Sequence, residues 1–306
     1  LENGARALAK PRGRPKTLLE AEQFNSAYRR GATELARLKA FSPNRVLSEF
    51  AENATAMSHL ATYRRDPVTL GVVMRGVAFG LPMNVRKQWP YHVVSLGILL
   101  VFTFIAFFSV LADPSTYYMF VDRGLASGRD PWASREFLAK SLEGHGSLDE
   151  NIAFSLMLFQ HNTRVAFICY STGVLLGLPT ILMLAMTGLM LGGMIAVFYR
   201  VGLTAEFMAW ILPHGVPEIG AIILCGGAGL ALGHRLLNPG NRPRGEVLSE
   251  TAMQSSVIAV SCAVLLFIAG FIEGVFRQSN ASLFVRYGLF AFLLAGMLAW
   301  LLFVRE

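Results

Sequence analysis

The chain has 306 residues, of which 54% are hydrophobic and only 15% charged, and its mean hydropathy is +0.48. This composition and the long apolar runs exclude an ordinary soluble globular protein and indicate an integral membrane protein. The net charge of +7 comes from residues 1–90, before the first apolar run, so the positive-inside rule predicts a cytoplasmic N-terminus.

The first 90 residues contain no apolar run long enough for a membrane span or a signal peptide. Residues 1–17 are predicted to be a flexible basic tail. Its KPRGRPK stretch resembles the AT-hook motif that binds the minor groove of DNA. Because only one copy is present, we expect the tail to be attracted to anionic lipid rather than to bind nucleic acid. Residues 18–90 are predicted to form a small cytoplasmic helical and interfacial domain. It has amphipathic helices over about 18–39 and 43–65 and an interfacial helix over 68–83 that is interrupted by Arg75.

Residues 91–306 are predicted to form an all-α, polytopic transmembrane domain. Six apolar stretches are long enough to span a bilayer, at 93–112, 154–178, 181–198, 207–232, 257–276 and 283–304. Six crossings return the C-terminus to the cytoplasm, and the basic loop at 234–250 fits that side. The polar segment at 113–152 is expected outside, with a short helix at 134–142. Pro213 and Pro217 are expected near the start of the fourth span, where the first-turn amides lack intrahelical partners.

Small residues predict where these helices pack closely. Glycines at four-residue spacing let two helix backbones approach each other. The candidates are Gly173, Gly177, Gly188, Gly192, Gly229, Gly233, Gly270 and Gly274. A methionine stripe at Met183, Met186, Met190 and Met194 is interpreted as core packing, because no His or Cys pattern joins it to form a copper site.

An intramembrane polar cluster is the main candidate site. His214 and Glu218 lie four residues apart, which places both on one face of the fourth span. An ionisable residue in a span is costly, so this face should point into the protein, with the other spans around it. In the six-span topology, Glu273 and the pair His161 and Asn162 reach the same outer depth. We therefore predict a cluster of all five residues.

Three interpretations of this cluster remain open at the level of sequence. It can be a structural hydrogen-bond network that holds helices together. It can be a zinc site in which His214, Glu218 and Glu273 bind the metal and water takes the fourth position. It can also serve a membrane-embedded hydrolase or proton relay with a carboxylate as base, although no Gly-x-Ser-x-Gly, HExxH or paired-Asp motif supports it. A small-solute transporter is a further alternative.

Three segments carry a family resemblance. The stretch LPHGVPEIGAIILCGGAGLALG resembles the signature of the stage II sporulation protein M family of bacterial membrane proteins. HNTRVAFICYSTGVLLG resembles the paired-Asn segment of that family, with Asn162 kept and His161 in place of the first Asn. FIEGVF resembles its Ile-Glu segment and supplies Glu273. The resemblance extends from about Phe24 to Val304, and the first stretch matches at Leu212, Pro213, His214, Gly215, Glu218, Gly229 and Gly233.

The resemblance implies a multi-pass protein of the bacterial cytoplasmic membrane without established catalysis. Family members in spore formers act as a membrane scaffold for cell-wall hydrolases that remodel peptidoglycan during engulfment, and relatives also occur in bacteria that make no spores. The basic tail and His161 depart from the family pattern. We expect a scaffold or membrane-remodelling protein that recruits cell-envelope enzymes, forms a homodimer in the bilayer and has both termini in the cytoplasm. The alternatives are a metal-dependent hydrolase using the same cluster, or a transporter.

Overall fold

A computed structural model describes residues 18–41, 49, 52–53, 55–56, 69–143, 148–276 and 281–305. Every regular element in these ranges is helical, which confirms the all-α prediction. The chain divides into two units, Leu1–Val68 and Thr69–Glu306, and each is described by itself. In the first unit, helix α2 (Leu18–Phe41) covers the first predicted amphipathic helix. The second, expected over 43–65, and the basic tail at 1–17 fall almost wholly outside the described residues.

The second unit begins with a helical segment that lies across the end of the last helix. It consists of α4 (Leu70–Arg75), the π-helical turn η1 (Gly76–Gly80) and α5 (Leu81–Lys87). The carbonyl of Ala78, inside the π turn, accepts a hydrogen bond of 2.9 Å from the indole of Trp300. Arg86 donates to the carbonyls of Leu301 and Val304. These contacts explain why the helical segment continues to Lys87, beyond the predicted end at residue 83.

Among the described residues, five helices are long and apolar enough to cross a membrane. They are α6 (Trp89–Ala112), α11 (Leu178–Arg200), α12 (Thr204–Leu237), α14 (Leu283–Phe303) and the Arg244–Gly270 part of α13 (Arg244–Phe276). The remaining predicted span, the second at 154–178, corresponds to α10 (Leu148–Ser171), a 24-residue helix of lower hydropathy that begins and ends earlier than predicted. Its 24 residues rise about 36 Å, which is enough to cross a hydrocarbon core. The chain is therefore a polytopic helical membrane protein.

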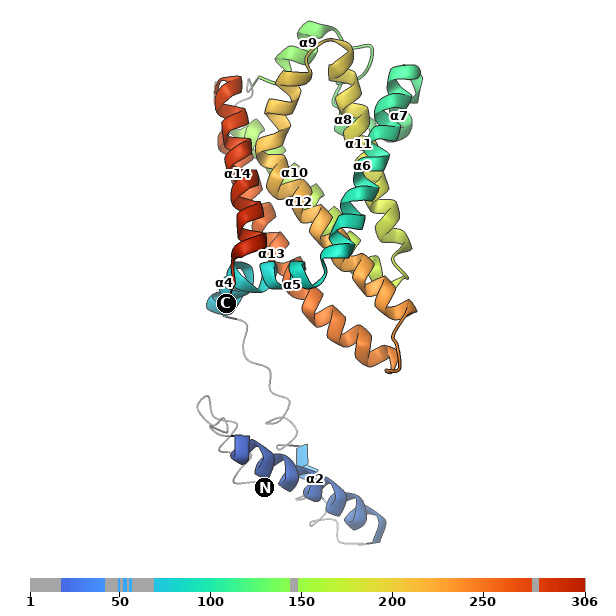
Figure 1. Ribbon diagram of the computed structural model, residues 1–306, viewed down its shortest axis with the longest axis vertical. Helices are drawn as coiled ribbons and strands as arrows, with labels where there is room; N and C mark the ends of the chain where they lie inside the picture. The colour runs from blue at the N-terminus through green and yellow to red at the C-terminus, as the bar shows by residue number, and fades with distance from the viewer. Residues whose placement is uncertain are drawn as a thin grey trace. The chain divides into compact units, whose positions relative to one another are not determined.

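Helix α12 is the central helix of the bundle. It packs against α6, α10, α11, α13 and α14, and Figure 1 shows it running through the middle of the unit. Within its apolar window, 78% of the residues are buried inside the protein, whereas the corresponding figure for α14 is 0%. Because no residue in the apolar window of α14 is buried inside the protein, most of the surface of this helix must meet lipid or another subunit. The expectation that the other spans surround the helix of His214 and Glu218 is confirmed.

The prolines of α12 lie deeper in the helix than the sequence suggested. The helix begins at Thr204, so Pro213 and Pro217 are in its interior and not in its first turn. The prediction was wrong because the helix begins before the predicted span: Phe207, in its first turn, is buried and stacks on Phe198 with ring centroids 4.3 Å apart. A proline has no amide hydrogen, so the carbonyls of Ala209 and Pro213 lose their usual intrahelical donors. This part of α12 is therefore a locally weakened helix held by its neighbours.

A folded cap covers one end of the bundle. The cap is defined here as residues 113–143, with η2 (Pro114–Thr116), α7 (Tyr117–Phe120), α8 (Arg123–Ala126) and α9 (Arg135–Lys140). Helix α9 confirms the short helix predicted at 134–142, and the Ser134 hydroxyl accepts from the Phe137 amide at its start. Tyr117 is fully buried, and its hydroxyl donates to the carbonyl of Arg129 at 2.6 Å. Figure 1 shows the cap at the opposite end of this unit from α4 and α5.

Glycines bring several helix pairs into backbone contact. A methyl group at Gly188 would overlap the carbonyl oxygen of Leu99, and one at Gly192 would overlap that of Thr103. From the first contact to the second, the residue numbers increase along both helices, so α6 and α11 run in the same direction. Gly229 of α12 lies against the carbonyl of Cys169 at the end of α10. Of the other candidates, Gly173, Gly177 and Gly233 contact backbone atoms of a neighbouring segment, and Gly270 makes an ordinary contact with a side chain. The surroundings of Gly274 are not among those that the structure describes.

Candidate functional site

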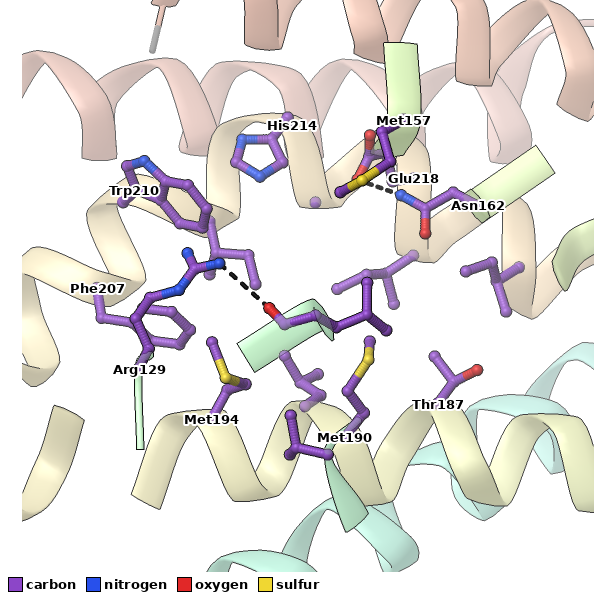
Figure 2. Close-up of a pocket in the computed structure, with 17 residues that line it drawn as sticks. Arg129, Met157, Asn162, Thr187, Met190, Met194, Phe207, Trp210, His214 and Glu218 are labelled. Atoms are coloured by element: carbon purple, nitrogen blue, oxygen red, sulfur yellow. Dashed lines mark hydrogen bonds between the residues drawn. The ribbon is translucent and has the colours of Figure 1, made fainter. Parts of the chain in front are cut away.

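A pocket of about 140 Å³ lies among α10, α11, α12 and the cap. Figure 2 shows His214 and Glu218 on one helix along one side of it, facing Met190 and Met194 of α11. The lining is mostly apolar, and the pocket lies in the half of the bundle nearer the cap. Its polar and charged lining residues are Arg129, Asn162, Thr187, His214 and Glu218.

Glu218 forms the polar link between α10 and α12. Its side chain is 6% exposed, and its Oε2 accepts a hydrogen bond of 2.9 Å from Nδ2 of Asn162. The other carboxylate oxygen, Oε1, is buried and has no hydrogen-bond partner in the described part of the chain. A buried polar atom without a partner is costly and rare in folded proteins. This oxygen can therefore accept a hydrogen bond from a molecule that enters the pocket, or bind a cation there.

His214 and Trp210 form the side of the pocket nearer the cap. Their rings lie one turn apart on α12, in an edge-to-face arrangement with centroids 5.5 Å apart. The guanidinium carbon of Arg129 lies 5.9 Å from the centre of the Trp210 ring, a cation–π distance. One polar wall of the pocket is thus built from an imidazole, an indole and a guanidinium.

Arg129 belongs to the cap and is only 7% exposed. Its Nε donates to the carbonyl of Ala126 at 3.1 Å and its Nη2 to that of Leu125 at 3.3 Å, which compensates part of the cost of burying its charge. The sequence did not single out this residue. Nothing in residues 113–143 distinguishes Arg129 from the other bases of that segment, because only the folding of the cap onto α11 and α12 brings it to Trp210.

The other predicted members of the cluster have different positions. His161 precedes Asn162 on α10, is half-buried and lines another cavity of about 330 Å³, together with Tyr118, Asp122 and Met186. Glu273 belongs to α13, but its side chain lies outside the part that the structure describes. The structure thus brings together Asn162, His214 and Glu218, and it adds Arg129 and Trp210 to them.

The chemistry that this pocket can support is limited by its described donors. No group of three His, Cys, Asp or Glu side chains that could hold a metal is found among the described residues. His214 and Glu218 supply two candidate ligands, and the predicted zinc site needs Glu273 as the third, so it stays a prediction. Thr187, a hydroxyl in the lining, donates to the carbonyl of Met183 in its own helix. The described lining can bind polar groups but offers no activated nucleophile.

Comparison with known proteins adds a family. Residues 95–276, more than half of the chain, match the family described as Stage II sporulation protein M. This range covers most of α6, the cap and the helices α10 to α13, and so includes every residue that lines the pocket. No curated protein and no solved structure matches the chain.

Proposed function

Because the chain belongs to the stage II sporulation protein M family, we propose that it is an integral membrane scaffold that recruits peptidoglycan-remodelling enzymes of the cell envelope. In this proposal the protein lies in the bacterial cytoplasmic membrane with both termini inside, so that the cap faces the cell wall. The structural observation that carries the proposal is that residues 113–143 fold into short helical elements, whose buried side chains pack against α11 and α12.

The surface of the cap has the properties of a protein-binding platform. Trp132 is 63% exposed and stacks on the ring of Tyr118, with centroids 6.2 Å apart and planes at 14°. The hydroxyl of Tyr118 donates to Asp130, and the guanidinium carbon of Arg123 lies over the Tyr118 ring, 4.8 Å from its centroid. Exposed aromatic side chains that are already held in place lose little entropy on binding, and they are frequent energetic centres of interfaces.

The polar cluster has a structural role in this scaffold. The hydrogen bond between Asn162 and Glu218 joins α10 to α12, and Arg129 attaches the cap to Trp210 of the same helix. Hydrophobicity alone does not hold helices together in lipid, so polar contacts of this kind contribute to the association. A rigid bundle keeps the platform at a fixed height above the membrane.

Recruitment is tested with the full-length chain as bait in detergent-solubilised membranes of the source bacterium. The Trp132→Ala variant should capture much less of the envelope hydrolases, because it removes the exposed indole. Phe303→Ala is the matched control, because Phe303 is an exposed aromatic residue, at 76%, at the end of α14 opposite the cap, where Arg86 contacts Leu301 and Val304. Equal capture of hydrolases by both variants, or none by the unaltered chain, contradicts the proposal. The proposed homodimer is tested by the mass of the purified protein in detergent.

The unpartnered oxygen of Glu218 and its cavity favour a second candidate, a metal-dependent hydrolase in the membrane that uses His214, Glu218 and Glu273. Metal analysis of the purified protein distinguishes the two functions. Stoichiometric zinc that is lost in His214→Ala would support the enzyme and argue against a pure scaffold. A folded protein without zinc in either form would contradict the enzyme. Uptake of solutes into liposomes tests the transporter alternative.

A further inference from the structure

A further cavity, of about 300 Å³, lies at the end of the bundle opposite the cap. Three segments form it: the residues that start α6, the last turns of α12, and the connection at 238–243 with the first turns of α13. Two helices, α6 and α13, begin here, and two, α5 and α12, end here. The partial charges of the helix ends therefore offset each other, and the charged side chains decide the sign of the cavity.

The charges that line this cavity are mainly positive. Lys87, Arg235 and Arg242 line it together with a single acid, Glu250. Arg242 pairs with Glu250 through Nη1 and Oε2 at 2.8 Å, so these two charges offset each other. Neither Lys87 nor Arg235 has an ion-pair partner in the described part of the chain. Two uncompensated cations therefore face one cavity, which favours an anionic ligand.

A buried hydrogen-bond donor in the same cavity points to the same kind of ligand. Gln88 is 6% exposed, and its Oε1 accepts a hydrogen bond of 3.2 Å from Ser255. Its Nε2 is buried and has no acceptor among the residues that the structure describes. Tyr91, one turn along, shares a hydrogen bond of 2.6 Å with Nδ1 of His234. An anion with several oxygens, such as phosphate, would satisfy the amide and both cations at once.

Apolar side chains at this end of the bundle indicate where the anion comes from. Trp89, Leu237 and Met253 neighbour the lining residues in sequence and are 61%, 59% and 60% exposed. Tryptophan next to a cluster of basic residues is typical of the interface between bilayer and water. A ligand that reaches the cavity from this interface would carry an acyl chain along the outside of the bundle.

We propose that this cavity binds the phosphate group of an acidic phospholipid. Lys87 and Arg235 supply the charge, and Nε2 of Gln88 supplies a directed hydrogen bond. Basic pockets between membrane helices bind anionic lipid head groups in this way. A soluble phosphate ester has the same binding chemistry, but the exposed apolar side chains beside the cavity favour the lipid. The assignment does not depend on the scaffold function, because it concerns the opposite end of the bundle.

The experiment uses the full-length protein, purified in detergent and freed of native lipid. Phosphatidylglycerol and phosphatidylcholine are titrated separately, and bound lipid is counted by native mass spectrometry. The protein should retain phosphatidylglycerol selectively. Lys87→Gln and Arg235→Gln should each weaken its binding by about fivefold. Gln88→Glu, which preserves the size of the side chain and puts a negative charge in the cavity, should abolish binding.

Arg244→Gln is the matched control, because Arg244 carries the same charge at the same end but does not line the cavity. It should bind phosphatidylglycerol as the unaltered protein does, and all variants should keep the same melting temperature without lipid. Equal weakening by Arg244→Gln and Arg235→Gln would show general surface attraction and overturn the site. Glycerol 3-phosphate is tested alone. If glycerol 3-phosphate stabilises the unaltered protein but not the Gln88→Glu variant, and phosphatidylglycerol does not bind, the cavity binds a soluble phosphate ester and the proposed lipid is wrong.

Discussion

At the scale of single residues, the hydrogen bond between Asn162 and Glu218 is the contact most open to test. Asn162→Ala removes the donor to Oε2 of Glu218 and leaves a buried carboxyl group with no described partner. The loss should lower the stability of the bundle by about 1–3 kcal/mol. The measurement is the thermal unfolding midpoint in detergent. His161→Ala is the control, because it alters the neighbouring half-buried residue, which lines a different cavity.

A double-mutant cycle makes this test specific to the pair. Asn162→Ala combined with Glu218→Ala should destabilise the protein by less than the sum of the single changes, because the two residues interact directly. Additive effects would mean that the contact contributes nothing to stability. Glu218→Gln should be tolerated as a fold, because its amide keeps an acceptor for Asn162 without a charge.

The sequence predicted residues of the pocket correctly where helical periodicity places them on one face. His214 and Glu218 share one buried face of α12, as their spacing required. Asn162 was predicted to join this pair because the six-span topology brings its helix and α12 to the same depth in the membrane. Arg129 and Trp210 were not foreseen, because their proximity depends on how the cap folds and no local pattern encodes it.

At the scale of elements, sequence located the helices better than it located their ends. The basic connection predicted at 234–250 is only residues 238–243, because α12 continues to Leu237 and α13 begins at Arg244. Hydropathy marks the part of a helix that lies in lipid, whereas the helix itself ends where its backbone finds other partners. Val247 and Thr251 are buried in the added turns, so tertiary packing stabilises them.

The contact between α6 and α11 provides the element-scale prediction. Gly192→Ala would place a methyl group against the backbone carbonyl of Thr103, which has no side-chain freedom to move away. Overpacking of this kind should destabilise the protein by about 1–3 kcal/mol. Gly97→Ala on α6 is the control, because nothing lies within 4 Å of its added methyl group. If the two variants unfold at the same midpoint, the close approach of these helices is disproved.

At the scale of the whole molecule, the two ends of the bundle differ in charge. The cap mixes acids and bases, with Asp113, Asp122 and Asp130 beside Arg123 and Arg129. The opposite end is mostly basic in the described residues, with Glu246 and Glu250 as its acids and Arg75, Arg86, Lys87, Arg235, Arg242, Arg244 and Arg305 as its bases. The positive-inside rule therefore predicts that the end opposite the cap lies in the cytoplasm.

Cysteine labelling of intact cells tests this orientation. The three native cysteines, Cys169, Cys225 and Cys262, are buried and should not react. Glu136→Cys on the exposed face of α9 should be labelled by a membrane-impermeant maleimide. Asn241→Cys, in the connection between α12 and α13, should be labelled only after the cells are permeabilised. The reverse pattern would invert the topology and place the cap in the cytoplasm, where it could not meet enzymes of the cell wall.

The sequence by itself determined the class of the protein, the approximate position of its spans, the family and the buried face of α12. These follow from local properties, because apolar length, helical period and the cost of buried charge act within one segment. Only the tertiary structure decided that α12 is central, that Arg129 of the cap meets Trp210, and that Gln88 and two cations share a cavity. Such contacts join residues far apart in the chain, and their geometry depends on how close the glycines allow the helices to come.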